Sequence, residues 1–169
     1  CQLPPLVGIS STFYLSWKEV GNIARRLRAF DADMDIVLGG AFANAGQLCV
    51  SISRVIVHES IADKFTDMLK GKIEAIKVGP GTEPDTKMGP LVSQGQLESV
   101  LEYVEKGRQE GAKLVTGGER LTGGVFDKGH YMSPALFTGV DPNSTIAQEE
   151  IFGPVLAVMT FKRFRSEER

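Results

Sequence analysis

The sequence predicts an α/β fold in which a largely parallel sheet is flanked by helices. One supporting observation is that short runs rich in β-branched and aromatic residues alternate with longer segments whose apolar residues recur at helical spacing. Another is that stretches rich in Gly and Pro separate these segments. With 169 residues, 42% of them hydrophobic, the chain is long enough to bury a core of its own.

The predicted helices and strands alternate along the chain. In order, they are a helix at about 34–45, a strand at about 54–57, a helix at about 61–76, a helix at about 93–110, a strand at 113–116, a strand around 135–137, a short helix at about 145–148 and a strand at 155–161. Ser60 and Ser93 are expected to cap the second and third helices, and Gly111 to end the third.

Three regions carry little regular structure in this prediction. Residues 77–92 form a loop rich in Gly and Pro, and residues 117–129 form a turn-rich excursion on the surface. In residues 1–30 the predicted element is a short basic helix over 20–27, whose arginines are expected to face solvent.

The composition excludes several classes of function. The 19 basic and 21 acidic residues give a net charge of −2, so there is no reason to expect a nucleic-acid partner. Two cysteines and two histidines are too few for a disulfide framework or a metal cluster, and they fit a reducing, cytoplasmic location. The uncharged stretches 1–17 and 36–53 are interrupted by prolines or by glycines and amides, so we expect no membrane partner.

One stretch stands out, residues 42–49, where an apolar, small-residue segment runs into a Gly-Gln turn that delivers the thiol of Cys49. A run with the β-branched composition of a strand, 51–57, follows directly. Cys49 is therefore expected in a loop between a helix and a strand, which hold a reactive group on both sides. The alternative is a buried, unreactive cysteine, but the polar residues around Cys49 favour an accessible thiol.

This stretch resembles the nucleophile segment of the NAD(P)-dependent aldehyde dehydrogenases, in which Gly-Gln-x-Cys follows an Asn-Ala pair and precedes Ser-Arg-Val-x-Val. Three later segments resemble the same family in the family's order, and they are 88–92 (MGPLV), 110–118 (EGAKLVTGG) and 149–155 (EEIFGPV). The resemblance covers about residues 31–162. It implies a fold like that of the family's catalytic domain.

The resemblance also implies a cofactor, NAD or NADP, and roles for four residues. Cys49 would be the nucleophile that attacks the carbonyl of a small-molecule aldehyde. Glu150 would bind the ribose hydroxyls next to the nicotinamide, Phe152 would pack beside the nicotinamide, and Gln96 would touch the ribose on the adenine side. Without the motif, Glu150 would be interpreted as a surface charge and Phe152 as a core aromatic. No metal is implied, and the parent protein is expected to be a homo-oligomer.

The chain departs from the family pattern in important places. The family's general base is the Glu of a Glu-Leu-Gly-Gly motif well before the nucleophile, whereas Val37 precedes the Leu-Gly-Gly of this chain. The family's Asn oxyanion donor and its glycine-rich cofactor domain have no counterpart in the sequence. Residues 1–30 resemble a remnant of the end of the cofactor-binding domain, and residues 31–169 a partial catalytic domain. We therefore expect a truncated chain that does not oxidise aldehydes alone at a meaningful rate.

Three functions stay open. The first is oxidation of an aldehyde to a carboxylic acid through a cysteine thiohemiacetal and thioester, with hydride transfer to NAD(P). The segment 131–137 (YMSPALF) resembles the semialdehyde-oxidising members of the family. The second is a cysteine hydrolase that uses Cys49 with His58 or His130, which leaves the segment 149–155 unexplained. The third is a non-catalytic relic of the fold that acts in binding or assembly.

Overall fold

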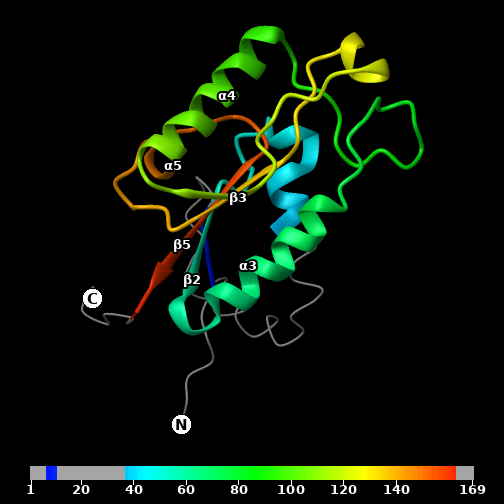
Figure 1. Cartoon of the computed structure of the whole chain (residues 1–169). Coiled ribbons are helices and arrows are strands. Elements are labelled where there is room, and N and C mark those ends of the chain that lie inside the picture. The colour runs from blue at the N-terminus through cyan, green and yellow to red at the C-terminus, as the bar shows by residue number, and fades with distance from the viewer. Residues whose placement is uncertain (1–6, 11–36, 163–169) are drawn as a thin grey trace.

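The computed structural model describes residues 7–10 and 37–162. The described elements are, in chain order, β1 (Val7–Ser10), the 3-10 helix η1 (Ala43–Gly46), β2 (Arg54–His58), α3 (Glu59–Glu74), α4 (Gln94–Gln109), β3 (Lys113–Thr116), the 3-10 helix η2 (Gly124–Lys128), β4 (Ala135–Thr138), α5 (Thr145–Gln148) and β5 (Val155–Phe161). Residues 37–42 are also helical. The strands form one five-stranded sheet in the order β1-β2-β5-β4-β3 (Figure 1).

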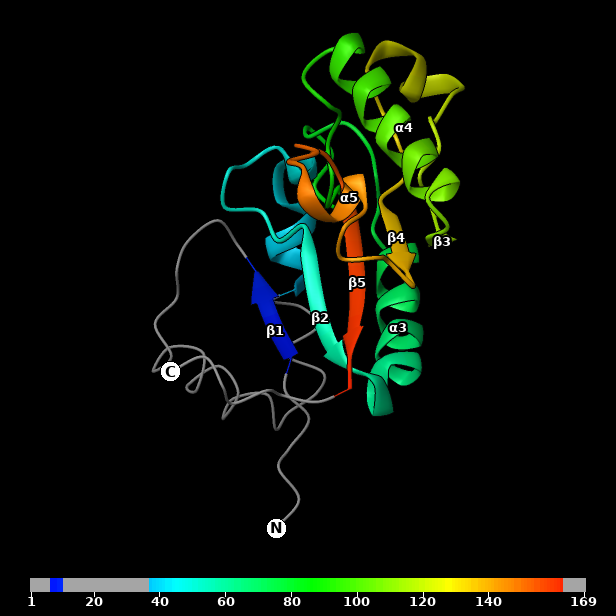
Figure 2. The same ribbon diagram turned by 90° about the vertical axis from the view of Figure 1, so that its left-hand side faces the viewer.

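The centre of the sheet is parallel and its edges are antiparallel. β5 pairs in parallel with β2 on one side and with β4 on the other (Figure 2). β1 and β3 add to β2 and β4 as antiparallel edge strands. The predicted α/β fold is thus confirmed, with its parallel pairing in the three central strands. β1 is not predicted from the sequence, because four residues that include a glycine are too few to show a period.

Helices cover both faces of this sheet. α3 packs across β2, β5, β4 and β3, while α4 contacts β3 and α5. Figure 1 shows α3 and α4 on opposite sides of the sheet. Consequently the first three residues of β4 and the first five of β5 are all buried. A strand covered on both faces needs a continuous apolar run rather than an alternating one, and ALF in β4 and VLAVM in β5 provide it.

Each long helix begins with a side-chain cap. Ser93 Oγ accepts a hydrogen bond from Gln96 N at 3.1 Å, as predicted for α4. The predicted cap of α3 is wrong, because α3 begins at Glu59 and its cap is His58, whose Nδ1 accepts from Ser60 N at 3.2 Å. Since the His58 ring satisfies an amide that the first helical turn leaves without a partner, Ser60 lies inside the helix instead of before it.

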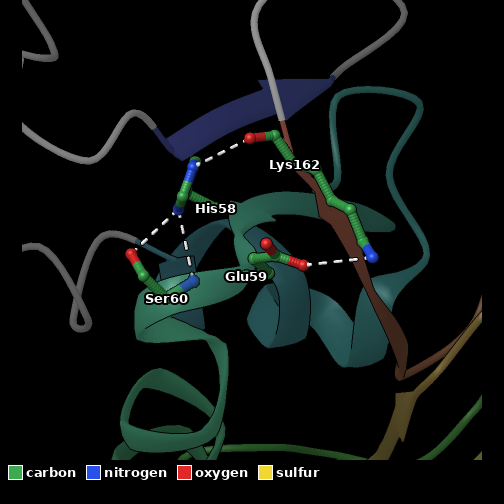
Figure 3. A network of polar contacts seen from close by, with 4 residues as sticks. All are labelled: His58, Glu59, Ser60 and Lys162. Carbon is green, nitrogen blue, oxygen red and sulfur yellow. Dashed lines mark hydrogen bonds and ion pairs between the residues drawn. The ribbon is translucent and has the colours of Figure 1, made fainter.

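His58 also joins the carboxyl ends of β2 and β5 (Figure 3). Its Nε2 lies 3.2 Å from Lys162 O, and its Nδ1 lies 2.8 Å from Ser60 Oγ. Lys162 Nζ in turn pairs with Glu59 Oε2 at 3.8 Å. Because Nδ1 accepts from a backbone N–H, the ring proton belongs on Nε2, where it is donated to the Lys162 carbonyl.

The remaining predicted elements are found close to their expected bounds. The strands 113–116 and 155–161 and the helix 145–148 occur as predicted, and α4 ends before Gly111, whose φ is +90°. The predicted basic helix at 20–27 lies outside the described residues. In the part of the chain that the structure describes, no helix is both long enough and apolar enough to cross a membrane.

Candidate active site

The helix before Cys49 ends in an unusual turn. Asn44, Ala45 and Gly46 have φ values of +51°, +54° and +69°, so three consecutive residues adopt the left-handed conformation. For Asn44 and Ala45 this backbone is costly, and it stops the helix at Phe42 rather than at 45 as predicted. The turn reverses the chain before it reaches the thiol.

Cys49 lies at the tip of the loop that follows. A hydrogen bond from Ser51 N to Leu48 O, 2.9 Å long, closes a tight turn around it, and the side chain of Cys49 is exposed. The alternative of a buried cysteine is therefore wrong. Gln47 connects this loop to the segment before α4, since its Oε1 accepts a hydrogen bond from Val92 N at 2.8 Å.

The Cys49 loop touches the loop at 149–154, which contains the second family motif. A Cβ on Gly46 would lie 2.2 Å from Gly153 O, and a Cβ on Gly153 would lie 2.4 Å from Val100 Cγ2 of α4. Both distances are far too short for any side chain, so Gly46 allows the two loop backbones to stack and Gly153 allows the second loop to pack against α4.

The sheet explains why these loops meet. The Cys49 loop leads into β2 at Arg54, and the loop 149–154 leads into β5 at Val155. β2 and β5 are adjacent and parallel, with Arg54 paired to Ala157. The amino ends of β2 and β5 therefore lie at the same end of the sheet, and so do the two loops that precede these strands (Figure 2).

A cavity of about 150 Å³ lies between the two loops. Its lining includes Cys49, Ser51 and Arg54 from one side and Glu150 and Phe152 from the other. The structure thus brings together three of the four residues predicted for the site, although about a hundred positions separate Cys49 from Glu150 in the sequence.

The side chains of Glu150 and Phe152 are both exposed. Glu150 is exposed, and its carboxylate makes no hydrogen bond or ion pair with any described residue. Phe152 is 38% exposed, and its backbone is left-handed with φ +54°. An exposed aromatic ring on a strained backbone is not a core residue, so that alternative is wrong for Phe152.

Gln96, the fourth predicted residue, does not line the cavity. Its Nε2 donates to Phe152 O at 3.0 Å and lies 3.4 Å from Ile151 O. Gln96 therefore contacts the site indirectly, through hydrogen bonds to the backbone of the loop 149–154. Its contact with a cofactor stays a prediction.

Ser51 and Arg54 also line the cavity. Ser51, which follows the nucleophile closely, is expected from the sequence to lie at the mouth of the substrate site, whereas the sequence reasoning gives Arg54 no site role. The guanidinium of Arg54 donates through Nη1 to Ala147 O at the end of α5. Arg54 Nε and Ser51 Oγ are buried, and neither has a hydrogen-bond partner among the described residues. Unpaired polar atoms beside a cavity are where a bound molecule or water is held. The motif Ser-Arg-Val marks Arg54 in the sequence, but its reach to α5 is visible only in the fold.

Neither histidine lies at the thiol. His58 is at the opposite end of β2 and is bonded to Ser60 and Lys162. His130 precedes β4, where its carbonyl accepts from Leu91 N. Neither residue lines the cavity that contains Cys49, so the hydrolase interpretation has no histidine beside its nucleophile. The described residues also contain no group of three or more His, Cys, Asp or Glu that could hold a metal ion.

Comparison with known sequences identifies relatives of this chain. The sequence profile described as "Aldehyde dehydrogenase family" matches residues 27–167. The alpha-ketoglutaric semialdehyde dehydrogenase of Bacillus subtilis (strain 168) is 43% identical over 145 residues, which cover 83% of this chain and 30% of that protein. The alpha-ketoglutarate semialdehyde dehydrogenase of Haloferax volcanii is 48% identical over 130 residues, 77% of this chain and 27% of that protein.

Solved structures agree with the sequence relatives. A betaine aldehyde dehydrogenase from Staphylococcus aureus, crystallised in complex with NAD+, matches with a TM-score of 0.77 and 36% identity, over 79% of this chain and 27% of that one. The chain thus spans less than a third of the length of the relatives it matches. The fold, the motif order and these matches agree, and the chain belongs to the aldehyde dehydrogenase family.

Proposed function

We propose that this chain carries the nucleophile and the nicotinamide-facing part of an active site that oxidises an aldehyde to a carboxylic acid. The observation that supports this proposal best is the cavity shared by Cys49, Glu150 and Phe152. A cysteine at the edge of an open cavity can meet a small substrate, and the opposite wall supplies a carboxylate and an aromatic ring.

In this proposal, Cys49 attacks the aldehyde carbon as its thiolate. The S–C bond forms while the carbonyl π bond breaks, and the product is a thiohemiacetal whose oxygen carries the negative charge. The backbone N–H of Cys49, in its tight turn, is the proposed donor to this oxygen. When bound, a nicotinamide held by Glu150 and Phe152 would supply the acceptor for the hydride that leaves the thiohemiacetal C–H bond as the thioester forms.

The residues present fit one end of such a cofactor. The Glu150 carboxylate, which has no partner among the described residues, can accept hydrogen bonds from two ribose hydroxyls. Phe152 is exposed beside it and can flank a flat ring. Pockets that bury a whole drug-sized ligand measure about 300–1,000 Å³. The cavity of about 150 Å³ has room for the nicotinamide end, while the rest of NAD or NADP would extend beyond it.

A semialdehyde is the proposed substrate, because the relatives at 43% and 48% identity are named for semialdehydes. Hydrolysis of the thioester needs a base for the attacking water. Among the described residues, the only acids that line the cavity are Glu149, which accepts a hydrogen bond from Tyr103, and Glu150, which this proposal assigns to the ribose hydroxyls. We therefore expect the chain alone to form the acyl-enzyme and then to stop. Since only a thiol kept reduced can act, a cytoplasmic location is proposed as well.

Mass spectrometry of the Cys49 peptide tests this proposal. The folded chain is incubated with a semialdehyde, with and without NAD, and an acyl adduct on Cys49 that requires NAD is the expected result. Glu150→Gln should slow this acylation about tenfold or more, because it weakens two hydrogen bonds of about 0.5–1.5 kcal/mol each. Glu98→Gln, which makes the same charge change on the surface of α4, is the matched control.

Two results would contradict the proposal. One is native Cys49 that resists iodoacetamide until denaturant is added, since the thiol would then be inaccessible to substrate. The other is sustained NADH production by the Cys49→Ala variant, since the reaction would then use another group.

A further inference from the structure

The middle of the loop that carries Glu150 and Phe152 is not held by backbone hydrogen bonds. Among the described residues, no backbone–backbone hydrogen bond involves positions 150–152. Phe152 is also left-handed, a conformation that a phenylalanine does not keep without external support. The position of this loop must therefore be set by contacts from other elements.

Gln96 supplies such a contact on the downstream side of Glu150. Its side-chain amide projects from the first turn of α4 and donates to Phe152 O, and Ile151 O is within 3.4 Å of the same nitrogen. The two carbonyls belong to the residues directly after Glu150. One side-chain amide thus holds the two peptide units that join Ile151 to Phe152 and Phe152 to Gly153, directly before the contact of Gly153 with α4.

Arg54 supplies a contact on the upstream side. Its guanidinium starts from the first residue of β2, five positions after Cys49, and donates to Ala147 O at the end of α5. That carbonyl lies three residues before Glu150. Arg54 thereby ties the segment that carries Glu150 to the strand that carries the Cys49 loop.

We propose that Gln96 and Arg54 are positioning residues, which hold backbone carbonyls on both sides of Glu150 and so fix Glu150 and Phe152 opposite Cys49. This proposal rests on the proposed function. It also gives the Gln96 side chain a task that needs no contact with a cofactor. The two residues act from different elements, α4 and β2, so the loop is held where these elements meet rather than by its own sequence.

Hydrogen exchange of the two hydrogen-bonded amides that flank the loop, Glu149 N (to Thr145 O) and Val155 N (to Gly153 O), tests the contact itself. Gln96→Leu removes the donor, and exchange of these amides should rise about tenfold, the effect of losing about 1.4 kcal/mol of local stability. Gln94→Leu is the matched control, because Gln94 lies in the same helical turn and donates only to Glu98 of its own helix.

Arg54 is tested with two variants of similar length. Arg54→Lys keeps a donor and should leave the exchange of the Glu149 amide, which is bonded to Thr145 O, within about threefold of the parent chain, while Arg54→Met should raise it about tenfold. Equal exchange in Arg54→Lys and Arg54→Met would overturn the role of Arg54. Unchanged exchange in Gln96→Leu, or an equal rise in Gln94→Leu, would overturn the role of Gln96.

The positioning role is separated from a merely structural one by the NAD dependence of Cys49 acylation. Gln96→Leu should need about tenfold more NAD for half-maximal acylation, while iodoacetamide should label Cys49 at the parent rate. If exchange rises but the NAD dependence is unchanged, the contact is structural and the positioning role is overturned. A parent chain that is never acylated contradicts the proposed function instead, and the exchange experiment still decides whether the contacts hold the loop.

Discussion

The two loops that line the cavity are held in place in different ways. The Cys49 loop is built from its own residues: Gln47 N and Gln47 Nε2 both donate to Asn44 O, and Ser51 N donates to Leu48 O. The loop 149–154 depends on side chains from elsewhere in the fold. The hydrogen bonds that shape the nucleophile loop are therefore mostly local, whereas those that hold the facing loop come from distant elements.

The two loops touch at Gly46 and Gly153, and a substitution at this contact should have the largest effect on the free energy of unfolding. Gly46→Ala would place a methyl group 2.2 Å from Gly153 O on a left-handed backbone. Strain and overpacking of about 1–3 kcal/mol each should lower the free energy of unfolding by about 2–4 kcal/mol in urea titrations followed by circular dichroism. Gly39→Ala is the control, because nothing lies within 4 Å of its Cβ and it sits in the helical stretch 37–42.

Gly39→Ala should instead be neutral or stabilising by about 0.5–1 kcal/mol, since alanine is the better helix former. Equal unfolding midpoints for Gly46→Ala and the parent chain would show that the two loops are not in contact.

A smaller effect is expected from the link between the Cys49 loop and the segment before α4. Gln47→Met keeps the size of the side chain but removes the acceptor for Val92 N and the donor to Asn44 O. It should cost about 1–2 kcal/mol and abolish the protection of the Val92 amide in NMR exchange measurements. Gln109→Met, which loses a bond on the surface of α4, should cost less than about 0.5 kcal/mol. A protected Val92 amide in Gln47→Met would rule out the link.

His58 lies at the end of the β2–β5 pair opposite to the two loops, so substitution of His58 should leave both loops unchanged. His58→Ala removes the cap of α3 and the contact with Lys162 O, and it should cost about 1 kcal/mol of unfolding free energy. His58→Asn retains a capping acceptor and should recover part of this loss. A several-fold change in the alkylation rate of Cys49 in either variant would contradict the independence of the two ends.

The smallest effect concerns Tyr103 of α4, which supports the second loop through a surface contact. Its hydroxyl donates to Glu149 Oε2 at 2.7 Å, and this hydrogen bond, followed by burial and by the negative charge of Glu149, raises the pKa of Tyr103. Because the bond needs the protonated phenol, its contribution is complete below the pKa of tyrosine in the unfolded chain. It is lost as the pH rises through the higher pKa of the folded chain.

Ultraviolet titration measures this difference. The chain has three tyrosines, and Tyr103→Phe should remove a component that titrates above the ordinary range of tyrosine. Glu149→Gln should move the same component down towards that range. A Tyr103 component that does not shift in Glu149→Gln would mean that the two side chains are not hydrogen-bonded in solution.

Contiguous patterns predict much of this fold. The apolar run at 155–161, the Ser93 cap and the glycine after α4 are each visible within a few residues, and each is found in the structure. The His58 cap is missed because histidine is a rare cap residue and Ser60, two positions later, is a common one. The left-handed turn is missed because Ala45 has no intrinsic preference for positive φ, so tertiary structure overrides its propensity.

Part of the candidate site is likewise predicted by contiguous motifs, and part of it is not. Cys49, Glu150 and Phe152 are predicted from short motifs, and the structure places all three on one cavity. The contacts of Gln96 and Arg54 with distant carbonyls could not be predicted, because they join segments that are 55 and 93 positions apart. A hydrogen bond from a side chain to a backbone carbonyl can use any partner residue, so it leaves no signature in the partner's sequence.

The adjacency of β2 and β5 also has a consequence for biosynthesis. The backbone hydrogen bonds of the turn that carries Cys49 join residues within 40–52, but the opposite wall of the cavity is made about a hundred residues later. At a translation rate of about 5–20 residues per second, roughly 5–20 s separate the appearance of the thiol on a growing chain from that of Glu150. During this interval Cys49 is accessible without the loop that later faces it, so the nascent chain is the form in which oxidation of this thiol is least restrained.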